Sequence, residues 1–400
     1  MITTAEATRA ILAAVNPLES ENVTLEQATG RVLAQRVSAE RDQPPFDRVT
    51  MDGIAIAYAE FAKGTRSYPV QSMQAAGDPA QTLETGNAIE IMTGASLPDG
   101  ADCIVPVERI TVNDLGAHVE ANYEASERQF IHARGSDHAK GTGLLSPGTR
   151  VSPMDIAIIA SCGLAEVSVA KKPRVSVIST GNELVAAGNV IEPHQIRMSN
   201  GPALVAMLES NGFNNAEHDH LADEPEVLKE RIASHLELSD VLVLSGGVSM
   251  GKADYVPEVL AELGVKVAFH KVSQRPGKPM WFGIGPNGQA VFALPGNPVS
   301  ALVCSRQYVI PALRQMSGMA AAAPQFASLT TDVSFKPKLT NFLPVKLISN
   351  AAGQVLAMPV HTNTSGDFAA LSGTDGYVEL ALEETDFKSG TAVPLRRWHS

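Results

Sequence analysis

A glycine-rich loop between an apolar run and a helix pattern is the segment of this chain best suited to binding a ligand. Residues 241–244 are apolar and long enough for a buried strand, and residues 245–251 contain three glycines. Glycines let backbone N–H groups approach a ligand closely, and a helix N-terminus favours an anion. Asp254 stands at the start of the following helix pattern. The segment therefore predicts a phosphate site with a carboxylate at its rim.

Two other interpretations of this loop exist. Gly246 to Lys252 fits the G-x-x-x-x-G-K part of a nucleotide-binding P-loop. Ala253 stands where a P-loop has the Ser or Thr that binds Mg²⁺, which disfavours a nucleotide hydrolase of that kind. A glycine turn that only joins a strand to a helix is the other alternative. The loop alone leaves these alternatives open, so companion motifs must decide between them.

Two similar loops follow predicted strands in the same part of the chain. Residues 179–183 (STGNE) follow one apolar run, and residues 294–298 (LPGNP) follow another and lead into a helix. Parallel strands bring their carboxyl ends to one edge of a sheet, where doubly wound folds bind ligands. These loops therefore predict one shared site. The candidate binding residues are Thr180, Gly246, Gly247, Ser249, Pro295, Gly296, Asn297 and Pro298.

Acidic residues lie in or near these loops. Glu183 and Asp254 are expected to converge at the same edge, and carboxylates beside a phosphate loop suit Mg²⁺, which prefers oxygen ligands. Each acid has an ordinary alternative role at a helix N-terminus. That alternative is favoured for Asp223, because it opens a capping box with Glu226 before a helix pattern.

Three cations surround a Pro-Gly dipeptide further along the chain. Lys271, Arg275 and Lys278 flank residues 276–277 in a chain whose formal net charge is −12. Such a loop suits an oxyanion or a phosphate, and a solvated loop is the alternative. The acidic balance argues against general nucleic-acid binding. An anionic substrate must therefore be held by local basic residues and backbone amides.

Composition limits the class of protein. A chain of 400 residues indicates roughly two to four domains. No run approaches the ~18 apolar residues of a membrane span, and the first residues show no secretory signal. The three cysteines have no CxxC or zinc spacing, which is typical of a reduced, cytoplasmic protein. The absence of a GxSxG motif disfavours a serine hydrolase. His132 and His138 are interpreted as surface residues.

The pattern of elements predicts four regions. Residues 1–44 and 142–172 form an N-terminal split domain with a helix from a capping box at Thr3. Residues 45–141 have short apolar runs between turns, which predicts an inserted β-rich domain. Strands alternate with helices over residues 173–318, which predicts a mostly parallel, doubly wound α/β domain. In it, one long helix is expected from Asn297 to Met316, and residues 325–400 predict a C-terminal β domain.

Taken together, these motifs closely resemble the molybdopterin molybdenumtransferase (MoeA) family, which is related to the E domain of gephyrin. The resemblance covers nearly the whole chain. Its carriers are residues 45–53, 92–95, 98–102, 134–137, 179–184, 245–255, 275–279 and 294–300. It implies an elongated homodimer of multidomain α/β subunits, in which the doubly wound domain is MogA-like. The site would lie between the α/β domain of one subunit and the β domain of the other.

The resemblance also implies an activity. Such enzymes take adenylylated molybdopterin and molybdate with Mg²⁺ as cofactor, insert molybdenum at the dithiolene and release AMP. A transient contact with a molybdopterin adenylyltransferase is implied as well. The functional acids carried over are Asp52, Asp137, Glu183, Asp223 and Asp254, with Glu183 and Asp254 as metal ligands. Thr93 is a substrate-pocket hydroxyl, and Lys271, Arg275 and Lys278 would hold pterin phosphate or molybdate.

The chain departs from the family pattern at a few positions. Asn182 and Met198 stand where the family usually has Asp, Arg275 replaces a usual Lys, and Pro344 replaces a usual Arg. Retention of all the functional acids favours an enzyme. A non-catalytic molybdopterin-binding scaffold and a tungsten-specific insertase are the competing functions. A plain nucleotide phosphohydrolase is disfavoured by Ala253 and by the whole-chain match.

Overall fold

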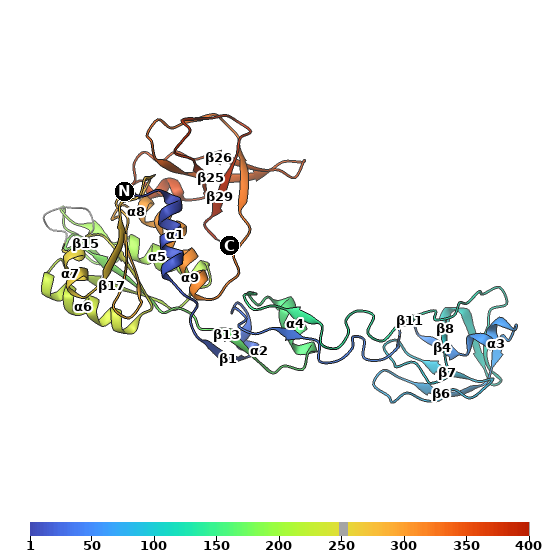
Figure 1. Cartoon of the computed structure of the whole chain (residues 1–400). Helices are drawn as coiled ribbons and strands as arrows, with labels where there is room; N and C mark the ends of the chain where they lie inside the picture. Colours follow the sequence, from blue (N-terminus) through green and yellow to red (C-terminus); the bar gives the residue numbers. More distant parts are fainter. Residues whose placement is uncertain (248–254, 400) are drawn as a thin grey trace. The chain divides into compact units, whose positions relative to one another are not determined.

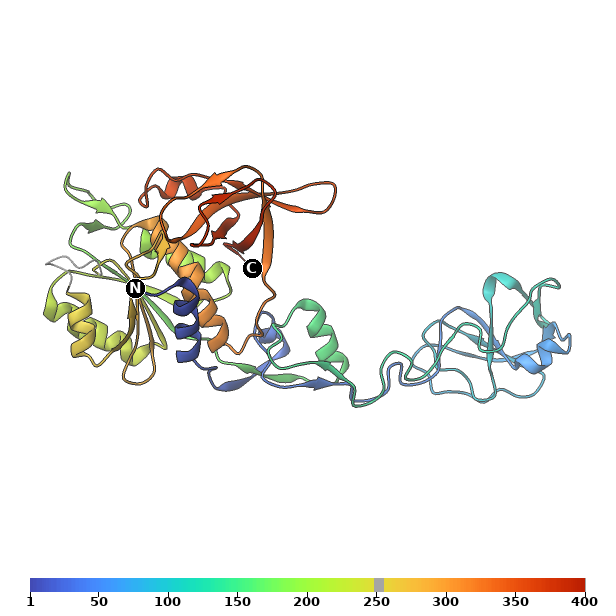
Figure 2. The same ribbon diagram turned by 45° about the horizontal axis from the view of Figure 1, so that its top comes forward.

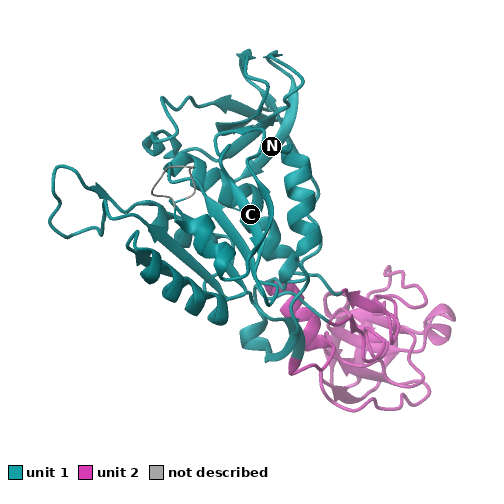
Figure 3. Cartoon of the chain, turned by 60° about the vertical axis from the view of Figure 1, so that its left-hand side comes forward, with its two compact units in different colours: residues 1–34, 147–152, 167–400 teal, residues 35–146, 153–166 magenta. Residues whose placement is uncertain are grey.

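The computed structural model describes residues 1–247 and 255–399, which divide into two compact units (Figure 3). Unit 1 comprises residues 1–34, 147–152 and 167–400, and unit 2 comprises residues 35–146 and 153–166. The predictions made for Ser249 and Asp254 lie outside the described residues.

The centre of unit 1 is a twisted sheet, visible beside the label β17 in Figure 1. Its strand order is β17-β14-β18-β22-β21-β19. Its strands are β14 (Val175–Thr180), β17 (Ala216–Leu221), β18 (Val241–Ser245), β19 (Lys266–His270), β21 (Trp281–Ile284) and β22 (Ala290–Leu294). The strands β17, β14, β18 and β22 run parallel, and β21 is antiparallel to both of its neighbours. The central strands β14, β18 and β22 are buried along their whole length, as expected from their apolar runs. The predicted doubly wound α/β domain is confirmed.

Helices cover both faces of this sheet (Figures 1 and 2). They are α1 (Thr4–Ala14), α5 (Asn200–Ser210), α6 (Pro225–Leu238), α7 (Val256–Glu262), α8 (Pro298–Cys304) and α9 (Ile310–Met316). Val243 packs in one core with residues of α1, α5, α8 and α9, whereas its neighbours Leu242 and Leu244 pack with α6 and α7. Alternate side chains of a strand point to opposite faces, so a short apolar strand builds both cores.

Two predictions about the N-termini of helices have different outcomes. The capping box of α1 is confirmed: the Thr3 N–H donates to Glu6 Oε2 at 2.8 Å and the Glu6 N–H donates to Thr3 Oγ1 at 3.2 Å. The capping box predicted at Asp223 is wrong, because the N-cap of α6 is Glu224 and its side chain makes no capping bond. Pro225 takes the first helical position, where a residue needs no N–H for an intrahelical hydrogen bond. The N-cap is therefore Glu224, one residue after the predicted Asp223.

The long helix predicted from Asn297 to Met316 is confirmed: α8, a π-helical segment (Ser305–Val309) and α9 form one continuous helical run that ends at Met316. Asn297 is the N-cap of α8 but makes no side-chain capping bond. Pro311 lies in the first turn of α9 and has no N–H to give to a carbonyl four residues earlier. The wider π turn accommodates that missing bond.

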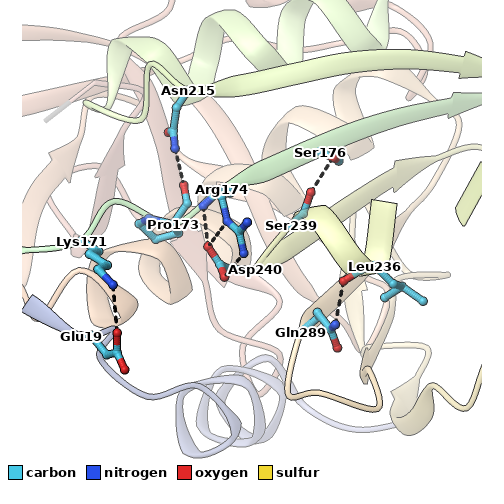
Figure 4. A network of polar contacts seen from close by, with 10 residues as sticks. All are labelled: Glu19, Lys171, Pro173, Arg174, Ser176, Asn215, Leu236, Ser239, Asp240 and Gln289. Carbon is cyan, nitrogen blue, oxygen red and sulfur yellow. Dashed lines mark hydrogen bonds and ion pairs between the residues drawn. The ribbon is translucent and has the colours of Figure 1, made fainter. Parts of the chain in front are cut away.

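Polar contacts fix the amino edge of the sheet (Figure 4). Arg174 and Asp240 directly precede β14 and β18, and the Arg174 N–H donates to Asp240 Oδ2 at 2.8 Å. The guanidinium group also donates to both carboxylate oxygens, at 3.3 and 3.2 Å. Nearby, the Ser176 and Ser239 hydroxyls are 2.7 Å apart. These contacts tie the strands together at the edge opposite to the predicted ligand loops.

The C-terminal part of unit 1 is a small barrel. Its strands are β23 (Gln325–Leu329), β25 (Thr340–Ser349), β26 (Val355–Pro359), β27 (Gly376–Leu380) and β29 (Ala392–Arg397). They follow the order β25-β26-β23-β29-β27, and an additional pairing of β25 with β27 closes the ring. The short strand β20 (Gln274–Arg275) comes from the α/β domain and pairs in parallel with β25. The predicted C-terminal β domain is confirmed and is barrel-like.

Shorter elements complete unit 1. They are α2 (Leu25–Ala28), the strands β1 (Ser20–Thr24) and β13 (Glu166–Ala170), β15 (Leu184–Val185) and β16 (Ile196–Arg197), β24 (Val333–Ser334) and β28 (Asp386–Phe387), and the 3-10 helix η3 (Phe368–Leu371). Each of these three strand couples forms its own two-stranded ladder. In the part of the chain that the structure describes, no helix combines the length and apolar character needed to cross a membrane.

Unit 2 is rich in strands, as predicted. One sheet has the order β6-β7-β4-β8 and another the order β5-β10-β9, with short ladders β3–β11 and β2–β12. Its elements are β2 (Val37–Ser38), β3 (Arg48–Val49), β4 (Gly53–Ile56), α3 (Tyr58–Ala62), β5 (Ser67–Tyr68), β6 (Val70–Gln74), β7 (Ala88–Ile91), β8 (Cys103–Pro106), η1 (Val107–Arg109), β9 (Ile110–Asn113), β10 (Gly116–Val119), β11 (Ile131–His132), β12 (Gly143–Leu145) and α4 (Pro153–Ser161).

Candidate functional site

A cavity of about 170 Å³ lies at the carboxyl edge of the sheet, where β14, β18 and β22 end; we call it the edge cavity. The structure thus brings the three predicted loops together. Its lining residues are Ser179, Thr180, Glu183, Leu184, Ile196, Arg197, Met198, Ser199, Asn200, Ser245, Gly246, Gly296, Asn297 and Pro298. The Asn200 amide donates to Ser245 Oγ at 2.9 Å and to the Gly296 carbonyl at 2.8 Å, so α5 links two of the loops.

The glycines after β18 are needed for close packing. Gly246 has φ +101°, and a Cβ there would lie 2.7 Å from the Thr180 carbonyl oxygen. Gly247 has φ +66°, and a Cβ there would lie 2.7 Å from a Val256 methyl. The Gly246 N–H donates to the Leu294 carbonyl at 3.4 Å, so this amide joins β18 to β22. Any side chain at either position would push the loop away from Thr180.

The Thr180 hydroxyl is an unsatisfied group in the wall of the edge cavity. Thr180 is 3 % exposed, and its Oγ1 has no hydrogen-bond partner among the described residues. A buried hydroxyl without a partner costs free energy, which a ligand in the cavity would recover.

The end of β17 holds the loop 179–183 in place. Ser179 Oγ is 3.0 Å from His218 Nε2, and His220 Nε2 donates to the Gly181 carbonyl at 2.9 Å. The Asp223 N–H donates to Asn182 Oδ1 at 3.1 Å. Burial lowers the pKa of His218, which keeps this ring neutral. Asp223 therefore lies beside the loop, although it is not among the residues that line the edge cavity.

The predicted Mg²⁺ ligands are only in part within the described residues. Glu183 lines the edge cavity, and Asp254 lies outside them. In the ranges 1–247 and 255–399, no group of three or more His, Cys, Asp or Glu residues is arranged to hold a metal. Mg²⁺ usually keeps several waters and binds through one or two carboxylates and substrate phosphates. One carboxylate beside the unpartnered Thr180 hydroxyl is an oxygen donor set that fits this mode.

A second cavity, of about 470 Å³, lies between the α/β domain and the barrel; we call it the barrel cavity. Asn297 lines both cavities, so they adjoin. The polar residues that line the barrel cavity include Gln274, Arg275, Lys278, Asn297, Ser300, Ser334, Asn341, His361, Thr362, Thr364 and Ser365, and Pro295 and Pro344 line it as well. Two of the predicted cations therefore reach it. Lys271 is not among the lining residues, and its carbonyl accepts the Ile2 N–H at 3.2 Å.

A buried polar cluster supports the loop that carries these cations. Gln274 is fully buried and donates from Nε2 to the Pro276 carbonyl at 3.0 Å, while the Tyr308 hydroxyl donates to Gln274 Oε1. Gly277 packs against Cys304, and a Cβ at Gly277 would overlap the sulfur. Burial raises the pKa of the Cys304 thiol to about 12, which excludes a thiolate nucleophile there.

Asp52 and Thr93 form a pair in unit 2. The Thr93 N–H and hydroxyl both donate to Asp52 Oδ1, at 2.6 and 2.7 Å. These bonds hold the pKa of Asp52 below its usual value, with the backbone donor as the larger cause. Gly53, the next residue, starts β4, where a Cβ would overlap the Val105 carbonyl oxygen.

Asp137 also lies in unit 2. One edge of strand β3 pairs with β11, and on the other edge the Gly94 N–H donates to the carbonyl of Val49 in β3 at 2.8 Å. His132 Nε2 is 3.0 Å from Asp137 Oδ1, and His132 Nδ1 is 3.1 Å from an Arg48 nitrogen. The structure thus brings Asp52, Thr93 and Asp137 onto neighbouring segments. His132, predicted to be a plain surface residue, connects two charged groups.

Known proteins match the chain from end to end. It matches the family descriptions "MoeA N-terminal region (domain I and II)" over residues 2–163, "Probable molybdopterin binding domain" over 176–315, and "MoeA C-terminal region (domain IV)" over 327–397. A molybdopterin molybdenumtransferase of Synechocystis sp. is 39 % identical over 100 % of both chains. One of Staphylococcus epidermidis is 31 % identical over 98 % of this chain and 95 % of its own.

A solved structure shows the same arrangement. The molybdopterin biosynthesis MoeA protein from Pyrococcus horikosii is 29 % identical, covers 100 % of both chains and superposes with a TM-score of 0.84. The sequence match and the fold match therefore agree over the full length. The chain belongs to the molybdopterin molybdenumtransferase (MoeA) family.

Proposed function

We propose that this enzyme of molybdenum cofactor biosynthesis inserts molybdenum from molybdate into adenylylated molybdopterin and releases AMP. The observation that carries the proposal is the pair of adjoining cavities in unit 1. The edge cavity offers a carboxylate and an unpartnered hydroxyl, and the barrel cavity offers Arg275 and Lys278. A substrate with a phosphoanhydride and an oxyanion partner needs both kinds of group within reach of one another.

Each set of residues has a distinct role in this proposal. Arg275 and Lys278 hold molybdate or the pterin phosphate, because a tetrahedral dianion is stabilised by cations. The Thr180 hydroxyl donates to a phosphate oxygen in the edge cavity. Mg²⁺, held by Glu183 and the predicted ligand Asp254, would neutralise charge that develops on the phosphates. Cys103, Cys162 and Cys304 are all buried, in accord with a substrate that brings its own sulfurs.

Asp52 and Asp137 of unit 2 are also functional acids in this proposal. Thr93 donates to Asp52 twice, which favours its ionised form, so Asp52 is suited to orient a donor on the substrate. The homodimer implied by the family resemblance is part of this proposal. So are the cytoplasmic location and a transient contact with a molybdopterin adenylyltransferase.

The test is AMP release from adenylylated molybdopterin with Mg²⁺, measured with molybdate, with tungstate and with neither. We expect molybdate-dependent release from the wild type and its loss in Asp52→Ala and Glu183→Ala. Asp114→Ala and Glu230→Ala remove exposed carboxylates of unit 2 and α6 that contact neither cavity, so they serve as matched controls.

The other outcomes identify the competing functions. Tight binding of molybdopterin without release of AMP would favour a non-catalytic scaffold. Release with tungstate alone would indicate a tungsten-specific insertase. Release at the same rate without either oxyanion would indicate a plain phosphohydrolase and would overturn the proposal.

A further inference from the structure

We infer that His132 is a positioning residue for Asp137, and that Arg48 fixes the ring so that its Nε2–H holds the Asp137 carboxylate. The inference rests on the proposed function, in which Asp137 is one of the functional acids. It adds two residues, Arg48 and His132, to which the family resemblance gave no role. Both act through Asp137.

The backbone places Arg48 and His132 side by side. They are directly opposite residues in the antiparallel ladder of β3 and β11. Opposite side chains on one face of such a ladder lie close enough to interact. Their neighbours Val49 and Ile131 form the next pair and point to the other face, where Val49 is 1 % exposed. Burial of that pair fixes the register and keeps Arg48 beside the ring.

The contact with Arg48 determines which ring nitrogen carries the proton. An Arg48 nitrogen lies 3.1 Å from His132 Nδ1, and a guanidinium group can only donate. Nδ1 must therefore supply a lone pair. When the ring carries one proton, that proton is on Nε2, which lies 3.0 Å from Asp137 Oδ1. Arg48 therefore donates to His132, and His132 in turn donates to the Asp137 carboxylate.

The backbone of Asp137 is fixed, but its carboxylate depends on the ring. The Asp137 N–H donates to the Gln43 carbonyl at 2.9 Å, and the His138 N–H donates to the same oxygen at 3.1 Å. The Asp137 side chain is 51 % exposed, whereas that of His132 is 31 % exposed. A half-exposed carboxylate rotates freely unless a donor holds one oxygen. His132 engages Oδ1 and leaves Oδ2 to meet a substrate.

The tautomer is tested directly in the full-length wild-type protein. Long-range ¹H–¹⁵N correlation spectra of histidine-labelled protein report which ring nitrogen carries a proton. The His132 signals are identified by their loss in His132→Gln. We expect a protonated Nε2 and a bare Nδ1 in the wild type, and a mixture of tautomers in Arg48→Met. A ring protonated on Nδ1 in the wild type would overturn the inference.

The positioning role is tested by kinetics on three variants. Glutamine has a donor and an acceptor as far apart as the two ring nitrogens, so His132→Gln should keep turnover within about threefold. His132→Leu keeps the bulk but neither polar group, and its kcat for AMP release should fall at least tenfold with KM nearly unchanged. His138→Gln changes the exposed histidine that follows Asp137 in the sequence and is the matched control.

The outcomes separate this inference from the proposed function. Equal turnover of His132→Leu and the wild type would overturn the positioning role. A loss of kcat in His132→Gln as large as in His132→Leu would also overturn it, because the retained hydrogen bonds would then be irrelevant. A wild type that never releases AMP would instead overturn the proposed function, while the spectra would still decide the tautomer.

Discussion

Thr93 gives two hydrogen bonds to a single oxygen of Asp52, one from its backbone N–H at 2.6 Å and one from its hydroxyl at 2.7 Å. One carboxylate oxygen thereby accepts both hydrogen bonds, and in the proposed function the other oxygen meets the substrate. The same arrangement recurs at Asp137, where His132 takes one oxygen. The two predicted acids of unit 2 are thus presented in the same way by different donors.

The first prediction concerns Thr93→Val. This variant removes the hydroxyl donor and keeps the backbone donor, so the Asp52 pKa should rise toward its usual value without reaching it. The pKa of Asp52 is lower in the folded protein than in the unfolded chain, so the contact with Thr93 stabilises the fold at pH values above the unfolded-state pKa. This stabilisation is lost as the pH falls through the folded-state pKa. Carbon-13 NMR titration of the carboxyl measures the shift. Turnover should fall roughly tenfold, as expected for about 1.4 kcal/mol of lost transition-state stabilisation. Thr93→Ser, which retains a hydroxyl, should stay near wild type in both measurements; a pKa unchanged in Thr93→Val would contradict the assignment.

The second prediction concerns Tyr308→Phe. Loss of the hydroxyl leaves Gln274 Oε1 buried without its donor, which should lower the free energy of unfolding by about 1–3 kcal/mol. The loop that carries Arg275 and Lys278 then loses support, so molybdate should bind more weakly in calorimetry. Tyr377→Phe removes a hydroxyl that donates to Gln307 at 2.7 Å and leaves this loop untouched. It should lose stability but keep its affinity for molybdate. Equal losses of affinity in both variants would show that Gln274 has no special effect.

The third prediction concerns Gly53→Ala. A methyl group there would overlap the Val105 carbonyl, which is backbone and cannot move without breaking the pairing of β4 with β8. The free energy of unfolding should fall by roughly 3–5 kcal/mol, in the range of severe core lesions. Gly64→Ala adds a methyl in open space at φ +100° and should cost only the backbone strain of about 1–2 kcal/mol. Chemical denaturation followed by far-UV circular dichroism compares the two; a smaller loss in Gly53→Ala than in Gly64→Ala is the contrary result.

The fourth prediction concerns the pH dependence of stability through Glu379. Burial raises the pKa of this carboxyl, although Arg396 and the Thr4 hydroxyl act in the opposite direction. The folded state then binds this proton more tightly than the unfolded state does. The free energy of unfolding should therefore decrease as the pH rises through the interval between the two pKa values. Glu379→Gln should flatten this decrease in urea titrations between about pH 4 and pH 8. The exposed Glu383→Gln should leave the profile as in the wild type.

Much of the α/β domain follows from local pattern. The apolar runs of β14, β18 and β22 predict buried parallel strands, and parallel strands must deliver their loops to one edge. What local pattern does not contain is register between distant segments. The contact of His132 with Arg48 depends on the pairing of β3 with β11, and closure of the barrel depends on the pairing of β25 with β27.

Proline explains one local error and one local irregularity. Pro225 places the N-cap of α6 at Glu224 instead of Asp223, and Pro311 accompanies the π-helical segment within the helix expected from Asn297 to Met316. Both effects arise from the missing N–H of proline, which the pattern of apolar positions does not register. The histidines at the end of β17 were also missed. Alternate polar positions on an edge strand are common, so His218 and His220 carried no signal until the loop 179–183 was placed beside them.

The short strand β20 is part of the α/β domain in the sequence, but it pairs with a strand of the barrel. Its residues Gln274 and Arg275 belong to the segment of the α/β domain that also carries Lys278, yet they pair with Thr340 and Asn341 of the barrel. The position of Arg275 is therefore fixed in part by the backbone of β25. If molybdate binds to Arg275 as proposed, we expect the amide hydrogens of β25 to exchange more slowly once it is bound. The barrel carries none of the predicted functional acids, yet through β20 it would influence how tightly Arg275 binds the proposed substrate.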